Sequence, residues 1–274
     1  MRTLALFVLG LGVLLPATTP GQQAGPPRAR KGPDLTRSPP RWPDGRISFT
    51  GTATEVGNWD GPAGATMIRN KGPDAFPGVA LPTNLSVDDV PFQPWARKQY
   101  EERRANLTAD DPHTRCKPSG GPRFWHTPYG IEVLDLPETK EIIFTHTGAP
   151  HSWRIVYLDG RPHPKDLKPS WYGHSIGHWE GDTLVIDTVG FNERFWFTRD
   201  GVPHTSKAHL IEHISRPNFY QLKYEATIDD PGAYTKTWSG GWYLRWVSGT
   251  EPFDYLCQEN NRDPGRMIGP QGQH

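Results

Sequence analysis

The sequence predicts an all-β protein: an antiparallel, lipocalin-like (calycin-type) barrel or a strongly curved sheet, preceded by one helix and an irregular N-terminal region. Gly and Pro number 29 each among 274 residues, which favours a chain with many turns. From Cys116 onward, short segments of alternating apolar and polar residues follow one another between turn residues. The 11 Trp, 11 Phe and 9 Tyr can fill a barrel core or form a stacking surface for sugars or aromatic compounds.

The N-terminus has the layout of a secretory signal peptide. Arg2 is followed by an apolar stretch at 4–15 and then by small and polar residues, so residues 1–24 are expected to be removed near Gly21 or Ala24. The stretch is shorter than the roughly 20 residues that a membrane-spanning helix needs. We therefore expect a secreted or periplasmic protein with no membrane span. Residues 25–45 are rich in Pro and Arg and indicate a flexible lead-in.

Residues 46–115 indicate an irregular segment followed by a helix. Short apolar pieces broken by Gly and Pro occupy the first part. The helix is expected within 91–112, where Trp95, Tyr100 and the residues around Leu107 recur with helical spacing. The Asp-Asp-Pro sequence that follows predicts its end.

Strands are expected through 116–263, and residues 264–274 form a tail. Alternation and turn signals predict pairs that are joined by short connections, which favours an up-and-down antiparallel barrel, with a sandwich as the second choice. The expected strands are 140–148 paired with 152–160, 174–179 with 183–191, 207–215 with 219–228, and then 236–246 and 253–260.

Charge and motifs restrict the partner. Lys+Arg and Asp+Glu both total 30, so no net field attracts nucleic acid or anionic lipid. The nucleotide-binding glycine patterns and the Gly-x-Ser-x-Gly nucleophile elbow are absent from the sequence. We expect a small-molecule ligand or substrate and no organic cofactor.

The two cysteines, Cys116 and Cys257, suggest one disulfide in an oxidising compartment. Such a long loop would stabilise the fold by about 4–5 kcal/mol in the chain-entropy description. Two free thiols, one of them a nucleophile, are the alternative.

Six ordered blocks resemble a large family of exported, mostly hypothetical bacterial proteins, recognisable by DGRPHP, GHSxGxWEGDTLVxDTxGFN, GxPHT and CxENNRD. The resemblance implies a secreted β-rich domain and brings no established activity. His178 stands where arginine or lysine is more usual, which argues against an essential metal ligand there. The blocks are residues 111–123, 157–164, 169–192, 201–217, 227–238 and 255–263.

One carboxylate is expected on an apolar strand face. Leu210, Glu212 and Ile214 share a side of their strand because side chains alternate. A carboxylate there is either paired with a cation or has a raised pKa, and a raised pKa suits proton transfer. The structural alternative is a carboxylate bound by Arg, Trp or a backbone amide that locks the barrel.

Tyr172, His174, His151 and His204 lie at expected strand ends. With Glu212 they could converge on a barrel mouth and abstract an acidic C–H proton, as in a lyase, or activate water, as in a hydrolase. A hydrogen-bonded loop anchor is the alternative for each. The candidate ligand-binding aromatics are Trp153, Trp171, Trp179 and Trp242.

The histidines offer only a weak metal hypothesis. His174 and His178 would lie about 13 Å apart along a strand, too far to share one ion. A site built from different strands would use His151, His174 and His204.

The expected function is a secreted, cofactor-independent acid–base enzyme, a lyase or hydrolase, that acts on a small aromatic or carbohydrate-derived compound. The alternative is a non-catalytic small-molecule-binding β-barrel, and a structural envelope protein is a third class. A cavity lined by His, Tyr and Glu would favour the enzyme, whereas an apolar cavity would favour the binding protein.

Overall fold

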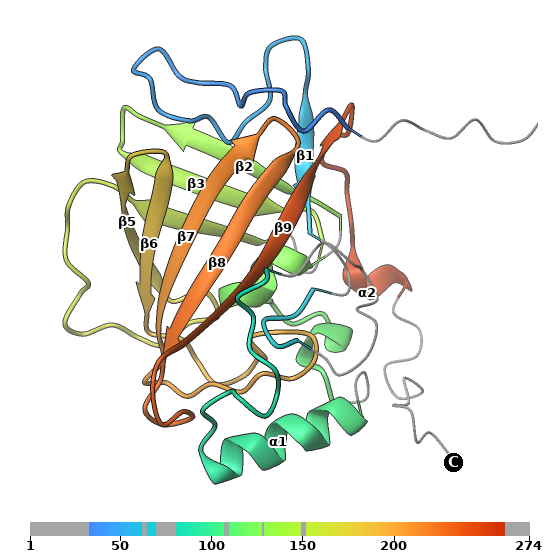
Figure 1. The fold of residues 1–274 in the computed structure, drawn as a ribbon, viewed down its shortest axis with the longest axis vertical. Helices are drawn as coiled ribbons and strands as arrows, with labels where there is room; N and C mark the ends of the chain where they lie inside the picture. Colours follow the sequence, from blue (N-terminus) through green and yellow to red (C-terminus); the bar gives the residue numbers. More distant parts are fainter. Residues whose placement is uncertain are drawn as a thin grey trace, which may run out of the picture. The chain divides into compact units, whose positions relative to one another are not determined.

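The described residues form a closed barrel of nine strands in the computed structural model (Figure 1). The structure describes residues 33–61, 65–69, 81–106, 110–127, 129–148 and 152–260. The strands follow one another around the barrel in chain order, and all belong to the compact unit Asp34–His274. They are β1 (Gly57–Asp60), β2 (Ile131–Leu136), β3 (Glu141–His146), β4 (Ser152–Tyr157), β5 (His174–Glu180), β6 (Thr183–Val189), β7 (His209–Asn218), β8 (Gln221–Asp229) and β9 (Trp238–Ser248).

The β-rich barrel confirms the expected class, but the expectation of a purely antiparallel wall is wrong. β4 and β5 are parallel neighbours, through the pairs Val156–Ser175 and Tyr157–Ile176. Nine strands that all alternated in direction would leave β1 and β9 parallel. The single parallel pair lets β9 close antiparallel on β1. The connection over 158–173 is long because parallel neighbours cannot be joined by a tight turn.

The helical elements differ from expectation at the C-terminal end. The predicted helix within 91–112 is present as α1 (Pro94–Ala105), with Pro94 in the first turn, where its missing N–H costs nothing. Two 3₁₀ helices follow, η1 (Pro112–Arg115) and η2 (Gly121–His126). The predicted strand at 253–260 is wrong, because its last residues form the short helix α2 (Cys257–Asn260) and the preceding ones are extended without a sheet partner.

Alternation explains why the long strands face as they do. Along β7, from His209 onward, half-buried and buried side chains alternate. Leu210, Glu212 and Ile214 therefore all point inward, as expected. The expected hairpin of β7 and β8 is present. The turn between β5 and β6 contains Gly181 at φ +57°, a left-handed conformation that glycine adopts without strain.

Aromatic rings fill the barrel interior. Trp125 enters from η2, and its ring centroid lies 4.9 Å from that of Phe144 on β3 and 5.2 Å from that of Tyr224 on β8. Trp59 and Trp242 are fully buried beside them. The abundance of aromatics is thus explained in large part by the core.

One ion pair lies at the centre of this apolar interior. Arg154 on β4 donates to both carboxylate oxygens of Glu212 on β7, with Nη1 3.0 Å from Oε1. Trp125 Nε1 and the Tyr224 hydroxyl also donate to Oε1, at 2.9 Å and 3.0 Å. Glu212 is fully buried. Its negative charge is therefore satisfied by four donors from three other elements.

The same arginine links two further strands. Arg154 Nε lies 3.0 Å from the Ser175 hydroxyl on β5, and Nη2 lies 2.7 Å from the Thr188 hydroxyl on β6. A charged network inside a low-dielectric core is stable only when every donor and acceptor is paired. Strands β4 to β8 thus share one polar network.

Replacing Glu212 with Gln should destabilise the fold strongly. The variant Glu212→Gln leaves the Arg154 charge buried without its counterion, at an expected cost of about 3–5 kcal/mol in the free energy of unfolding. The matched control Glu225→Gln removes an outward-facing carboxylate that pairs with Lys223 at 3.0 Å, and should cost less than about 1 kcal/mol. Urea unfolding measures both. Equal losses in the two variants would contradict the central role of the pair.

Candidate functional site

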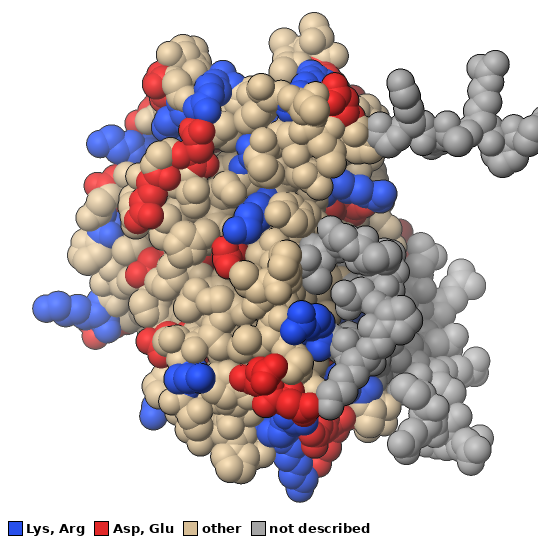
Figure 2. All heavy atoms as spheres, viewed as in Figure 1, with Lys and Arg blue, Asp and Glu red and all other residues tan. Residues whose placement is uncertain are grey.

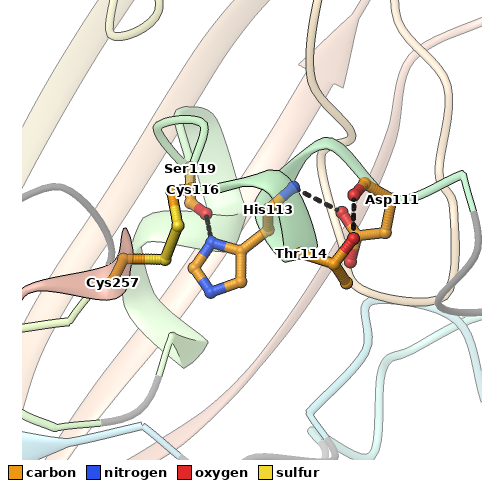
Figure 3. Close-up of a disulfide and its surroundings, with 6 residues drawn as sticks. All are labelled: Asp111, His113, Thr114, Cys116, Ser119 and Cys257. Carbon is orange, nitrogen blue, oxygen red and sulfur yellow. Dashed lines mark hydrogen bonds between the residues drawn. A yellow bond between two sulfur atoms is a disulfide. The ribbon is translucent and has the colours of Figure 1, made fainter. Parts of the chain in front are cut away.

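The predicted disulfide is present and joins η1 to α2 (Figure 3). Cys116 and Cys257 are 141 residues apart in the chain. Beside them, Nδ1 of His113 lies 2.8 Å from the Ser119 hydroxyl. Asp111 accepts the backbone N–H of His113, not the ring N–H, so no carboxylate orients this imidazole among the contacts described. Ser119 is only 2% exposed, and this arrangement favours a structural anchor over a nucleophilic serine.

The two buried candidates Glu212 and His204 occupy separate environments. Glu212 accepts from Arg154 inside the barrel, which favours its structural interpretation. The His204 ring stacks on Phe197 with centroids 4.0 Å apart, and its Nε2 lies 2.9 Å from the Asn192 carbonyl. Burial lowers the pKa of His204 to about 4.

Tyr172 adds no acid–base group to those environments. Tyr172 packs edge-on against Phe124, and burial raises its pKa to about 12. His151 lies outside the described residues.

The four candidate tryptophans have four different surroundings. Trp242 is fully buried in the core, whereas Trp153 is 63% exposed and lines a shallow depression of about 150 Å³. Trp171 packs against Phe195, and Trp179 stacks on Phe49 with centroids 5.5 Å apart. Only Trp179 contacts the larger groove described below, through Phe49.

His174 belongs to a histidine cluster that comprises His163, His174, Asp187 and His209 on the outer side of β5, β6 and β7. Nδ1 of His163 lies 2.8 Å from Nδ1 of His174. Asp187 Oδ1 lies 3.1 Å from Nε2 of His163 and 2.7 Å from Nε2 of His209. The contact between two ring nitrogens requires one donor and one acceptor, so at least one of the two imidazoles is neutral.

Charges within the cluster shift its pKa values in opposite directions. The hydrogen bond that the His209 ring donates to Asp187 raises the pKa of His209. Burial, followed by the proximity of His163, lowers the pKa of His174. Partial burial acts to raise the pKa of Asp187, but the hydrogen bonds from His209 and His163 outweigh it and lower the pKa. The cluster can therefore hold a neutral imidazole next to an ionised carboxylate.

A metal site is not formed by these groups. Among the described residues, no set of three or more His, Cys, Asp or Glu side chains has an arrangement that could hold a metal ion. In His163 both ring nitrogens already face partners.

A groove of about 610 Å³ opens at one end of the barrel between β2 and the segment 40–57 (blue in Figure 1). It exists because β1 forms four pairs with β9 but only one with β2, Trp59–Ile131. Beyond that pair, no further register pair joins the two strands. The lining is mainly apolar and consists of Pro40, Arg41, Trp42, Ser48, Phe49, Thr50, Gly51, Thr52, Ala53, Val56, Gly57, Ile131, Glu132, Val133, Leu134 and Trp246.

Arg216 holds the wall of the groove in place. Its Nη1 donates to the carbonyls of Ser48 and Thr50, both at 2.7 Å, and its guanidinium lies 5.3 Å from the ring of Trp246. Burial lowers the pKa of Arg216 to about 9. The carbonyls and rings thus stand in for the carboxylate that a buried arginine usually has.

Glycine at two positions lets the groove wall approach Trp246. A Cβ atom added at Gly51 or at Gly57 would lie 2.9 Å from the ring of Trp246 and closer still to backbone oxygen. Larger residues would therefore displace the wall that forms the groove.

Sequence reasoning missed Trp246, Glu132 and His163. Trp246 was expected in a strand but not at a ligand site. The Asp-Gly-Arg-Pro-His-Pro block that contains His163 was part of the family resemblance and could have drawn attention to it. Glu132 belongs to β2, which was not predicted.

No family model matches the chain, and comparison with curated proteins and with solved structures found no match. On the face drawn in Figure 2, basic and acidic side chains are interspersed, without a patch of one sign.

Within the described part of the chain, no helix has the length and apolar character needed to cross a membrane.

Acid should destabilise the fold through its buried neutral histidines. Burial lowers the pKa of His113, His146 and His204 from 6.5 to about 4 each. Because the folded pKa is depressed, the stability is complete above pH 6.5 and is lost as pH falls towards 4. Each histidine adds up to about 1.4 kcal/mol per pH unit to this slope.

The slope of unfolding free energy against pH, measured by urea unfolding between pH 7 and 4, checks this expectation. His204→Phe should lower the slope of unfolding free energy against pH, because the variant lacks one histidine that takes up a proton on unfolding. The control His178→Gln, which removes a 63% exposed side chain, should leave it unchanged. An unchanged slope in His204→Phe would contradict the account.

Proposed function

We propose that the chain is an exported ligand-binding barrel that takes a small, elongated and mainly apolar molecule in the groove between β1 and β2. The observation that carries this proposal is the groove itself. Its volume of about 610 Å³ is in the range of ligand pockets, and no His or Tyr lines it. A mainly apolar concavity, with Arg41 and Glu132 as its ionisable lining residues, favours binding over turnover.

A few polar groups in the groove would orient the ligand. Ser48, Thr50 and Thr52 lie on one wall and Glu132 on the other. Among the described residues, Glu132 has no ion-pair partner, which favours a ligand with a donor or positive group at one end. Trp246 offers a ring for stacking.

The barrel is lipocalin-like in this proposal because its strands follow chain order around a closed wall. It departs from that comparison inside, where Trp59, Trp125 and Trp242 fill the space. The ligand would therefore lie at the open seam. Export is supported by the signal-like N-terminus and by the Cys116–Cys257 disulfide.

The neutral fluorophore N-phenyl-1-naphthylamine tests this site. It should bind with a rise in emission, and the double variant Val56→Gln/Leu134→Gln should bind about tenfold more weakly because two exposed apolar groups of the groove are lost. Fluorescence titration measures the affinity. The control Leu35→Gln removes an equally exposed apolar side chain outside the groove and should bind normally. Equal binding by all three proteins would refute the groove as the site.

The expected acid–base enzyme is a second candidate function, and the histidine cluster is the observation that favours it. In this proposal, neutral His174 takes a substrate proton at Nε2. The Nδ1–H of His174 donates to Nδ1 of His163, and the Nε2–H of His163 donates to Asp187. The Asp187 carboxylate therefore stabilises the positive charge that forms on the imidazoles. The reaction would be a lyase or hydrolase step on a small aromatic or carbohydrate-derived compound.

A catalytic cluster predicts that His174→Gln loses about 100-fold in kcat/KM, because the proton acceptor is gone. Hydrolysis of 4-nitrophenyl acetate, together with elimination from a panel of uronate oligosaccharides, measures the loss. The exposed His178 on the same strand provides the control His178→Gln, which should keep the parental rate. If the unsubstituted protein turns over these substrates no faster than buffer alone, the hypothesis that the chain is an enzyme is wrong.

A further inference from the structure

The groove contains an unpaired strand edge. β2 runs from Ile131 to Leu136 and is paired with β3 along its whole length, yet its other side meets β1 only at Ile131. No described residue donates a backbone hydrogen bond to the remainder of that side. Free strand edges in native proteins are normally paired, covered or blocked by charge.

The register shows which backbone groups are free. Thr147 donates to the Gly130 carbonyl, so Gly130 and every second residue after it direct their backbone groups towards β3. The alternate residues Val133, which lines the groove, and Asp135, next along the strand, must then direct their N–H and C=O groups to the side of β2 that faces away from β3. On the opposite wall, Gly249 donates to Val56, which leaves the backbone groups of Gly57 facing the groove as well.

We propose that the natural ligand is an extended peptide that adds a strand antiparallel to β2. This inference rests on the proposed function for the site, the groove beside β2, and replaces the apolar small molecule by a peptide as the natural ligand. Main-chain hydrogen bonds to Val133 and Asp135 supply the affinity, and pockets for alternate side chains supply the selectivity. An apolar small molecule would leave the four backbone groups of these two residues unpaired, at a cost that an incoming strand avoids.

Charge specifies the peptide further. Of the two charged residues that line the groove, Arg41 binds Asp182 at 2.6 Å, and nearby Arg46 lies 3.3 Å from Asp135. Glu132 has no such partner among the described residues, so the groove carries one uncompensated negative charge. Glu132 and Leu134 lie two residues apart on the outward face. The matching peptide therefore carries Lys or Arg beside an apolar residue at the same two-residue spacing.

The test uses a fluorescein-labelled heptapeptide that alternates valine with lysine or threonine, added to the full chain. We expect it to displace N-phenyl-1-naphthylamine. Two N-methylated versions, each blocking one alternate set of peptide N–H groups, serve as matched probes. One set should weaken binding at least about tenfold more than the other, because only one set faces β2. Equal effects from both sets would overturn the pairing.

Hydrogen exchange locates the added strand without any substitution in the barrel. The Val133 and Asp135 amides should exchange faster than those of Glu132 and Leu134 in the free protein. The peptide should slow their exchange by at least about tenfold. Exchange that the peptide leaves unchanged would overturn the proposal.

A charge exchange tests the recognition of the basic residue. Glu132→Lys should reject the lysine peptide and accept its glutamate counterpart, whereas Glu180→Lys, at an exposed position outside the groove, should behave like the parent. Dye that binds in the groove but is never displaced by peptide would overturn the inference and leave the proposed function intact. Dye that fails to bind, with peptide still protecting Val133, would overturn only the apolar small-molecule form of the proposed function.

Discussion

The closure of the barrel through the single pair of Trp59 and Ile131 is the constraint on which the groove beside β2 depends. β9 holds β1 along four pairs and β3 holds β2 along six, so both strands are anchored on their outer sides. Between them one pair remains. The strand order closes the barrel, yet a groove remains beside β2 at the β1–β2 junction. The segment 40–57 forms one side of this groove.

The interior cannot serve as the ligand site because it is already filled. Trp125 and Tyr224 donate to Glu212, and Arg154 completes the network that joins β4 to β8. The ion pair and the surrounding rings leave the described interior to structural side chains. The proposed ligand site is therefore the groove at the end of the barrel, and the proposed acid–base chemistry lies outside the barrel, at the histidine cluster on β5 to β7.

Much of the fold could be predicted from local pattern, whereas the site could not. Alternation correctly directed Glu212 inward, and the composition together with the two cysteines indicated the barrel and the disulfide. The parallel β4–β5 pair escaped prediction because strand direction depends on the path of 158–173, and turn residues alone do not reveal it. β1 escaped because Gly57 and its neighbours form only four strand residues with weak alternation. The groove depends on where two such distant segments separate, which no local pattern encodes. Of the candidate residues, His174 has an unpredicted partner in His163, which in turn is bonded to Asp187, while His204 and Tyr172 lie buried among rings.

The most direct test of this account is a crystal structure of the full chain grown with N-phenyl-1-naphthylamine. The account predicts electron density for the dye between Gly57 and Val133, against Trp246, with the Arg154–Glu212 pair undisturbed. Density inside the barrel between Trp125 and Tyr224, or a fully paired β1–β2 seam with the dye elsewhere, would contradict it.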